Sequence, residues 1–253
     1  MHDINFFLQV TNYDKTDIVS YKIIHQGYTN KNFLIKTNDY KTYILRIPLK
    51  INDFVNEWNA YCNYQKIKFI YFDLTTGVYI KQFLIAEHPN LKNSQTLKLI
   101  IEELKIVHNK KLDYPIKKHN WLEWIQYNEL DSNILMFFYK IIDQIKDDKK
   151  TLTHHDINAA NILCINKQVF LIDWEWARLD SPYFDFATLA LDDNVDEKLL
   201  IIYANLDYVK LNKYKFIILV FSHMWCIYMN TKKTRDLKNE IFIKIKKMMA
   251  KML

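Results

Sequence analysis

The chain has 253 residues, of which 50% are hydrophobic and 25% charged, and its formal net charge is +6. Its two glycines, Gly27 and Gly77, are too few and too far apart to form a Rossmann G-x-G-x-x-G motif, a Walker A loop or the full glycine-rich loop of protein kinases. The positive charge is almost entirely dispersed lysine, which does not form the basic stripe of a nucleic-acid-binding surface.

The cysteines and the apolar runs indicate the cellular compartment in which the protein is expected. Cys62, Cys164 and Cys226 are odd in number and lie far apart, which favours neither a disulfide framework nor a zinc site. The first residues lack the basic and apolar stretches of a signal peptide. The longest apolar run, residues 216–229, is shorter than the roughly 20 residues of a membrane span. We therefore expect a cytoplasmic protein without a transmembrane segment.

The amino-terminal third of the chain is rich in β-branched and aromatic residues. This composition predicts strands near residues 18–24, 32–36, 43–47, 69–72 and 78–83. One helix is predicted to interrupt them over about residues 53–66, with Asn52 as its N-cap.

Beyond residue 90 the apolar residues follow a helical period. Helices are predicted near residues 95–109, 120–145, 196–207, 213–230 and 237–252. This order of elements predicts an α+β fold with two lobes that meet near residues 81–84. We expect an N-lobe of residues 1–82, a C-lobe of residues 83–253, and a ligand in the cleft between them.

Residues 153–173 interrupt the helical pattern of the C-lobe. Apolar residues at 162–165 and 168–172 flank the pair Asn166-Lys167, which has the length of a two-residue hairpin turn. Pairing of residue 165 with residue 168 would bring Asn161 beside Asp173, and Asp156 enters the same hairpin.

Asp156, Asn161 and Asp173 form a set of residues that suits phosphoryl transfer. One carboxylate can orient an attacking hydroxyl and accept its proton, while hard oxygen ligands can hold Mg²⁺ against the phosphates. The spacing H-x-D-x-x-x-x-N followed by a second Asp is typical of the catalytic loop and metal site of kinases. We therefore expect Asp156 to be the base and Asn161 and Asp173 to be the metal ligands. His154 is expected to organise the loop.

These motifs resemble those of the choline kinase and aminoglycoside phosphotransferase superfamily, and within it the bacterial choline kinases that initiate phosphocholine decoration. Residues 154–163 match the family pattern H-x-D-x-x-x-x-N-I-L, residues 172–177 match I-D-[WF]-E-[YF]-A, and residues 184–187 match F-D-[LI]-A. The resemblance covers most of the chain. It implies a protein-kinase-like fold, ATP and Mg²⁺ as cofactors, and a small alcohol as phosphoryl acceptor.

In the N-lobe the resemblance implies how the nucleotide is held. Residues 27–33 resemble the family loop G-G-x-T-N-x-x-[FY], in which Gln26 replaces the first glycine. This replacement should stiffen the loop and limit how closely its backbone approaches the phosphates. The candidate nucleotide-binding residues are Thr29 and Asn30 of this loop, Arg46 with its helical partner Glu57, and Gln82 and Phe83 at the hinge. A guanidinium suits this position because its planar fork can bind two phosphate oxygens.

The acceptor implied by the resemblance is choline, whose quaternary ammonium has no hydrogen to donate and is bound by aromatic faces with a carboxylate nearby. Trp225 and Tyr228 are three residues apart and therefore share a helical face, as in the family pattern W-x-x-W. The further candidate substrate-binding residues are Asp156, Glu175, Trp176, Tyr183 and Asp192. An aromatic pair at helical spacing is also typical of an ordinary core.

Alternatives remain open for both the acceptor and the chain ends. Another small alcohol, such as ethanolamine, an aminoglycoside or thiamine, could be the acceptor, and a nucleotide-binding scaffold without transfer is the alternative outside enzymes. Residues 237–253 predict a basic amphipathic helix, which could dock on the C-lobe or make weak contact with an anionic membrane surface. The sequence leaves the oligomeric state open.

Overall fold

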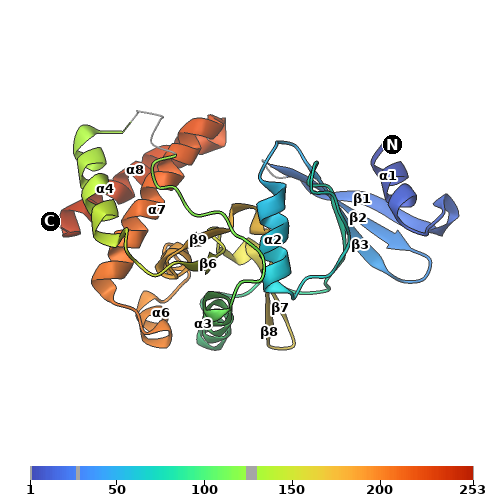
Figure 1. Cartoon of the computed structure of the whole chain (residues 1–253), viewed down its shortest axis with the longest axis horizontal. Coiled ribbons are helices and arrows are strands. Elements are labelled where there is room, and N and C mark those ends of the chain that lie inside the picture. Colours follow the sequence, from blue (N-terminus) through green and yellow to red (C-terminus); the bar gives the residue numbers. More distant parts are fainter. Residues whose placement is uncertain (1, 27–28, 124–129, 253) are drawn as a thin grey trace.

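The structure, a computed structural model, describes residues 2–26, 29–123 and 130–252. A strand-rich part with the amino terminus lies beside a helical part with the carboxyl terminus (Figure 1). This arrangement confirms the predicted α+β fold with an N-lobe and a C-lobe. The boundary between residues 82 and 83 stays a prediction.

The N-lobe is built on a five-stranded antiparallel sheet with the order β1-β2-β3-β5-β4. Its strands are β1 (Ile18–Gln26), β2 (Asn30–Thr37), β3 (Thr42–Pro48), β4 (Phe69–Phe72) and β5 (Tyr79–Gln82). All five lie where the sequence predicts strands. The agreement follows from the β-branched and aromatic residues, whose side chains pack well on a pleated surface.

Successive side chains of this sheet point to opposite faces, and both faces are covered. One face carries a buried cluster made of Phe7, Phe33, Ile35, Tyr43, Leu45 and Ile80. The opposite face carries a second cluster made of Leu34, Ile44 and Tyr79. Phe7 comes from helix α1 (His2–Val10), which is not predicted from the sequence because nine residues are too few to show a clear period.

Helix α2 (Phe54–Tyr64) contacts strand β4 through its aromatic side chains. Its N-cap is Asp53, whose Oδ1 accepts a hydrogen bond from the Asn56 N–H at 3.1 Å. The prediction of Asn52 as the cap is therefore wrong by one residue. Asn52 instead accepts from the Asp53 N–H at 2.8 Å, which leaves the helix N-terminus to the charged neighbour.

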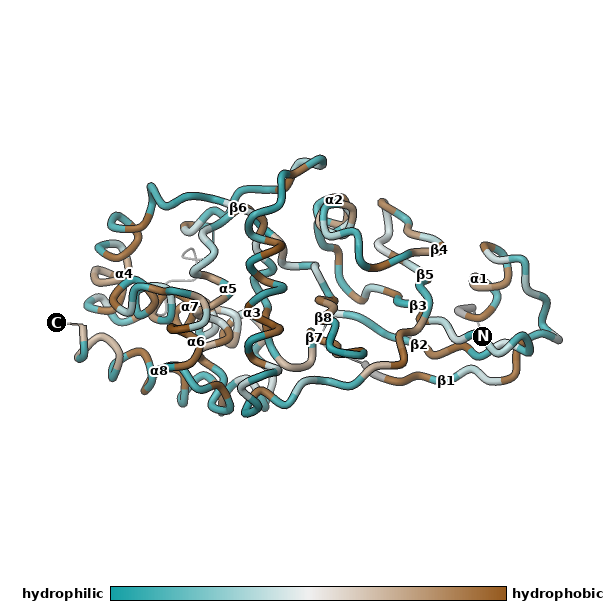
Figure 2. The backbone as a smooth tube through the Cα atoms, turned by 90° about the horizontal axis from the view of Figure 1, so that it is seen from below, coloured by the Kyte–Doolittle hydropathy of each residue, from teal (hydrophilic) through white to brown (hydrophobic). Residues whose placement is uncertain are grey.

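The C-lobe consists of helices with two short antiparallel strand pairs among them. Its helices are α3 (Ser94–Asn109), α4 (Ser132–Ile145), α5 (Tyr183–Ala190), α6 (Glu197–Ala204), α7 (Tyr208–Met229) and α8 (Lys232–Met252). The strand pairs are β6 (Thr151–Thr153) with β9 (Arg178–Asp180), and β7 (Ile162–Ile165) with β8 (Gln168–Leu171). Short 3-10 turns lie at Lys15–Asp17, Ala159–Asn161 and Trp174–Trp176. Figure 2 shows β7 and β8 between α3 and the N-lobe sheet, and hydrophobic and hydrophilic residues alternating along α3.

Several predicted helix limits in the C-lobe are wrong. The helix expected over residues 120–145 begins only at Ser132, where Asp131 accepts from the Asn133 N–H at 2.8 Å. Residues 121–123 form a turn closed by Asn120, and residues 124–129 lie outside the described residues. Helix α5 is not predicted at all, and α7 begins five residues before its predicted start because Asp207 caps it. Side-chain caps set the starts of α4 and α7, whereas the apolar period of the sequence does not mark these positions.

The last helix, α8, packs along α7, with Ile241 and Ile245 buried. This confirms the predicted docking on the C-lobe. Of the apolar side that the membrane-surface alternative would need, Ile241 and Ile245 are thus covered by the molecule itself, whereas Leu237 is exposed. Within the described parts of the chain, no helix combines the length and the apolar character needed to cross a bilayer.

Candidate active site

The predicted hairpin forms as expected between β7 and β8. Ile165 pairs with Gln168, and the turn residues Asn166 and Lys167 have φ angles of 48° and 66°. The Ile172 N–H donates to the Asn161 carbonyl at 3.0 Å, which continues the pairing to the residue before Asp173. The local turn therefore brings the two predicted metal ligands to the same end of the hairpin.

Asp156 is held by two amide side chains from its own loop. Asn161 Nδ2 donates to Asp156 Oδ2 at 2.7 Å, and Asn158 Nδ2 donates to Asp156 Oδ1 at 3.0 Å. Burial, assisted by the negative charge of Asp173, raises the pKa of Asp156 to about 6, although both amide hydrogen bonds oppose this shift. The structure thus fixes the carboxylate of the predicted base in one orientation.

His154 lies beneath this loop. Its Nε2 is 2.9 Å from the Ile172 carbonyl, and its ring is 4.6 Å from the Trp174 ring. Asp185 accepts from the His154 N–H at 2.9 Å and from the His155 N–H at 2.9 Å, so this residue of the F-D-[LI]-A motif anchors the loop backbone. Burial lowers the pKa of His154, which disfavours the protonated imidazole. This position fits the predicted loop-organising role.

Asp173 of the C-lobe contacts two residues of the N-lobe, Tyr61 and Arg46. Its φ angle is 66°, its N–H donates to the Tyr61 hydroxyl at 3.1 Å, and its Oδ1 is 3.4 Å from Arg46 Nη1. Arg46 Nη2 is 2.5 Å from Glu57 Oε2, and both side chains of this pair are almost completely buried. The guanidinium also lies 4.3 Å from the centre of the Tyr79 ring. The predicted pairing of Arg46 with Glu57 is therefore present.

The candidate nucleotide residues Thr29 and Asn30 both contact Glu175, a candidate substrate residue. Thr29 Oγ1 donates to Glu175 Oε1 at 3.1 Å, and Asn30 Nδ2 donates to Oε2 at 3.3 Å. Burial, with a further contribution from the charge of Asp173, raises the pKa of Glu175 to about 7. The candidate nucleotide residues Thr29 and Asn30 and the candidate substrate residue Glu175 thus form one hydrogen-bonded bridge between the lobes. Gly27 and Tyr28 lie outside the described residues.

Gln82 and Phe83, the hinge candidates, lie where the sheet ends. Gln82 is the last residue of β5, and the Phe83 N–H donates to the Thr42 carbonyl at 2.8 Å. The chain then leaves the sheet toward α3. Their predicted contact with a nucleotide stays a prediction.

A cavity of about 650 Å³ contains most of the remaining candidates. Its acidic lining residues are Glu123, Asp156, Asp173 and Glu175. Its aromatic lining residues are Trp176, Phe184, Phe221 and Trp225. A neighbouring cavity of about 260 Å³ shares Trp176 and Trp225 with it and adds Tyr228 and Lys50. Catalytic and aromatic candidates therefore share one space, as the resemblance implies.

Two candidate substrate residues lie elsewhere. The Tyr183 hydroxyl accepts from the Asp207 N–H at 2.9 Å, and the Tyr183 ring stacks on Tyr214. Asp192 accepts from the Asn194 side chain at 3.0 Å just beyond the end of α5. Neither residue is among those that line the two cavities. The substrate contacts of Tyr183 and Asp192 stay a prediction.

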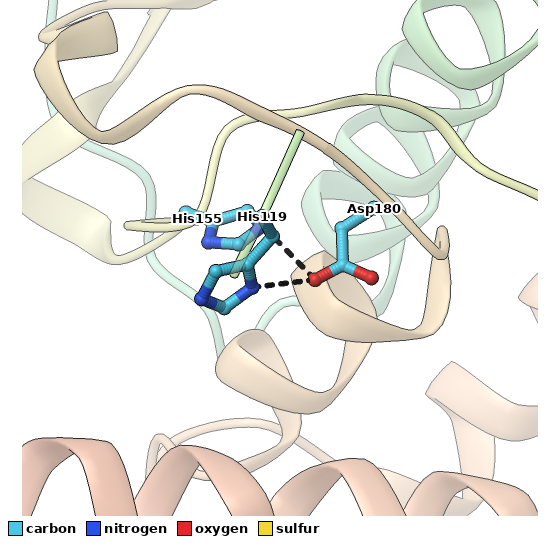
Figure 3. A group of neighbouring side chains, drawn as sticks. All are labelled: His119, His155 and Asp180. Carbon is cyan, nitrogen blue, oxygen red and sulfur yellow. Dashed lines mark hydrogen bonds and ion pairs between the residues drawn. The ribbon is translucent and has the colours of Figure 1, made fainter. Parts of the chain in front are cut away.

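The larger cavity also contains residues that the sequence does not single out. His119 and His155 line it, and both contact Asp180 at the end of β9 (Figure 3). His119 Nδ1 is 2.7 Å from Asp180 Oδ2, and burial lowers the pKa of His119 to about 4. The side chains of His119 and His155 hold the pKa of Asp180 well below its usual range, against the effect of its burial. His155 directly precedes Asp156 in the sequence and could have been noticed there. His119 lies far upstream, and no local pattern links it to the site.

Residues 117–212 match the sequence model described as the phosphotransferase enzyme family. The chain is 26% identical over 235 residues to the uncharacterized protein MG356 homolog of Mycoplasma pneumoniae, covering 88% of this chain and 83% of that protein. It is 27% identical over 190 residues to protein LicA of Haemophilus influenzae, covering 64% of this chain and 55% of that protein. The match therefore spans about half the length of that LicA protein.

Solved structures share the fold of the whole chain. Choline kinase LicA from Streptococcus pneumoniae superimposes with a TM-score of 0.78 at 18% identity, over 99% of this chain and 100% of that one. LicA in complex with AMP gives 0.73 at 17% identity, over 98% and 99%. The GDP and kanamycin complex of APH(2")-IIia gives 0.71 at 13% identity, over 100% and 99%. The segment with the catalytic-loop motif thus matches the phosphotransferase enzyme family, and the whole chain has the two-lobed fold shared by choline kinases and aminoglycoside phosphotransferases.

Proposed function

We propose that this chain is an ATP- and Mg²⁺-dependent kinase that phosphorylates the hydroxyl of choline. The observation that carries the proposal is the composition of the larger cavity, where Asp156 and Asp173 share the lining with Trp176 and Trp225. A carboxylate for the hydroxyl and aromatic faces for a quaternary ammonium are the two requirements of this acceptor. The match of the catalytic segment to the phosphotransferase family supports the reaction type.

Asp156 is proposed to act as the base. As the hydroxyl oxygen of the acceptor attacks the γ-phosphorus, Asp156 accepts the hydroxyl proton, the bond from phosphorus to the β,γ-bridging oxygen breaks, and ADP leaves. The hydrogen bonds from Asn158 and Asn161 fix the direction of the carboxylate. A carboxyl with a raised pKa is also a stronger base than an ordinary aspartate.

Arg46, Asn161 and Asp173 are proposed to hold the Mg·ATP. These donors suit Mg²⁺, which prefers oxygen ligands. The side chain of Asp173 is 37% exposed. The side-chain nitrogen of Asn161 donates to Asp156, which leaves the side-chain oxygen of Asn161 for a cation. When bound, Mg²⁺ would neutralise charge on the phosphate oxygens. Glu57 pairs with the Arg46 guanidinium, which lies 3.4 Å from Asp173. Nucleotide complexes of two proteins with this fold, one with AMP and one with GDP, support this part.

The acceptor assignment can be tested with labelled ATP and a panel of choline, ethanolamine, thiamine and kanamycin. We expect choline to be phosphorylated with the highest kcat/KM. A preference for kanamycin or thiamine would overturn the choline assignment and keep the kinase. Binding of Mg·ATP without transfer to any of the four would favour the nucleotide-binding scaffold.

The aromatic part of the site has its own test in two variants of one residue. Trp225→Ala should raise the KM for choline by about tenfold or more, because a desolvated cation–π contact is lost, whereas Trp225→Phe keeps an aromatic face and should lose much less. Ethanolamine, which can donate hydrogen bonds, should be less affected by either change. Equal losses for both acceptors in Trp225→Ala would contradict an aromatic site for the ammonium.

A further inference from the structure

Three side chains from separate segments meet at one wall of the larger cavity. His119 precedes α4, His155 lies in the catalytic loop, and Asp180 ends β9 (Figure 3). Each offers one ligand atom, and these atoms all lie within 4.8 Å of one another. The side chains are 9%, 7% and 0% exposed, in that order, so the cluster is nearly closed to solvent. Yet both histidines also line the cavity.

The two oxygens of Asp180 have different surroundings. Oδ1 accepts from the Ser181 N–H at 2.7 Å and from Lys150 Nζ at 3.1 Å. These contacts orient the carboxylate so that Oδ2 is left to the two imidazoles. His119 Nδ1 lies at hydrogen-bond distance from Oδ2, whereas His155 Nε2 is 3.5 Å away.

His155 Nε2 is buried and has no hydrogen-bond partner among the described residues. A buried polar atom left in this way typically costs about 1 to 3 kcal/mol. The backbone of His155 adds to the cost, because its φ angle of 68° is unfavourable for a residue other than glycine. Its ring is nevertheless fixed, stacked on Phe184 with centroids 3.7 Å apart. The chain thus keeps a strained, rigid imidazole whose Nε2 lies 3.5 Å from Asp180 Oδ2 without forming a hydrogen bond to it.

We propose that His119, His155 and Asp180 form a binding site for a transition-metal dication such as Zn²⁺. Two imidazoles and a carboxylate are a common Zn²⁺ ligand set, and a fourth position would open to the cavity. Mg²⁺, proposed for Asn161 and Asp173, prefers oxygen donors and is not expected here. This site does not depend on the proposed reaction.

A bound ion would require the three ligand atoms, which now lie within 4.8 Å of one another, to move to a common separation. Metal–ligand bonds of about 2.0 to 2.2 Å in a tetrahedral site separate two donor atoms by roughly 3.3 Å. The 3.5 Å between His155 Nε2 and Asp180 Oδ2 already matches this separation, and the 2.7 Å between His119 Nδ1 and Oδ2 must lengthen by roughly half an ångström. Ser181 and Lys150 supply the outer contacts that orient a ligating carboxylate.

The probe for this site is Co²⁺ added to the full-length, metal-free protein without nucleotide. We expect one equivalent to bind with the visible absorption of four-coordinate cobalt, and Zn²⁺ to displace it. His155→Gly removes a ligand at a position where glycine suits the backbone, so this variant should fold and should bind Co²⁺ about tenfold or more weakly. His119→Gln should show the same loss. Unchanged Co²⁺ affinity in His155→Gly, or no four-coordinate spectrum in the unmodified protein, would overturn the proposal.

Three further variants separate this site from other causes. His88→Gln removes a histidine outside the cluster, and Asp173→Asn removes a proposed Mg²⁺ ligand, so both should keep the cobalt spectrum. Loss of the spectrum in either would place the ion elsewhere. Lys150→Met removes an outer contact to Asp180 Oδ1 and should weaken Co²⁺ binding about tenfold, while its thermal unfolding without metal shows that the variant is folded. Unchanged or tighter binding in a folded Lys150→Met variant would count against Asp180 as a ligand.

Discussion

At the scale of single residues, Asp156 owes its properties to two neighbours and to burial. Asn158 and Asn161 each donate to one carboxylate oxygen, and the nearby Asp173 adds a repulsive charge. Two carboxylates, those of Asp156 and Asp173, lie close together where they are partly buried. Their repulsion and burial reduce the stability of the folded protein. Removing the charge should therefore harm transfer and not folding.

We predict that Asp156→Asn lowers kcat by about 10² to 10⁴-fold, the range typical of a lost general base. Its melting temperature should equal or exceed that of the unmodified protein, because a buried charge beside Asp173 is removed. Labelled-ATP assays and thermal unfolding measure the two effects. Near-normal transfer by this variant would assign the base to another group.

Gly77 is a second residue whose role is set by its surroundings. Its φ angle is 69°, and a Cβ placed there would lie 2.2 Å from Cδ1 of Phe54. We predict that Gly77→Ala destabilises the protein by about 2 to 5 kcal/mol, from backbone strain together with the clash. Denaturant unfolding gives this free energy.

The matched test for Gly77 is the pair Gly77→Ala and Phe54→Ala. Because Ala removes the Cγ, Cδ1 and Cε1 atoms that a new Cβ would meet, the double variant should be less destabilised than the sum of the single variants. Simple additivity would show that the ring does not limit this position.

At the scale of elements, strand β5 carries a buried lysine into the sheet. Lys81 is 9% exposed, and its Nζ is 5.4 Å from the centre of the Tyr79 ring. Burial lowers its pKa from 10.5 to about 8. Below pH 8 the group is charged in both the folded and the unfolded chain, so the folded state carries the whole desolvation cost there. Between pH 8 and 10.5 the folded state loses the proton first, and the cost falls.

We predict that Lys81→Met raises the free energy of unfolding by about 2 to 3 kcal/mol at pH 7, and that this gain shrinks as the pH approaches 10.5. Lys81→Arg, which keeps a charge in the strand, should show no such gain. Denaturant unfolding at a series of pH values measures both. A gain for Lys81→Met that does not change with pH would mean that the lysine charge is not the cause.

Local chemistry explains which elements are predictable. The β7–β8 hairpin is correct because its turn needs only two residues that tolerate a positive φ angle, and Asn166 is one of them. The start of α4 is wrong because Asn120 and Asp131 can both end a turn or cap a helix, and the apolar period continues between them. Helix α5 was missed because eight residues buried on several sides have no clear apolar stripe.

At the scale of the whole molecule, α2 of the N-lobe is tied to the C-lobe by asparagines. Asn56 Nδ2 donates to the Ala177 carbonyl at 2.8 Å, and its Oδ1 accepts from the Lys117 N–H at 2.7 Å. Asn63 makes similar bonds to the backbone of residues 113 and 114. Because α2 also carries Glu57, these bonds fix the distance between the Arg46 pair and Asp173.

We predict that Asn56→Ala destabilises the protein by about 2 to 4 kcal/mol, because two buried backbone groups lose their partner. The control is Asn59→Ala, which removes one exposed hydrogen bond to Pro115 and should cost less than about 1 kcal/mol. Thermal and denaturant unfolding of the two variants measure the difference. Equal costs would contradict a special contribution of Asn56 to the contact between the lobes.

The class of fold, the strands of the sheet and the hairpin that brings Asn161 close to Asp173 could all be predicted from the amino-acid sequence. These features depend on residues close together in the chain, where turn geometry and side-chain period act directly. The pairing of Arg46 with Glu57 was predictable as well, but only through the family resemblance.

The remaining contacts of the site follow from the packing of distant segments. That packing places Thr29 against Glu175 and His119 against Asp180. Such contacts join segments far apart in the chain, and their partners are selected by how helices and sheet pack, which no local pattern records. The residues that line the cavity therefore depend on how the lobes pack, whereas the catalytic loop can be predicted from its own short segment.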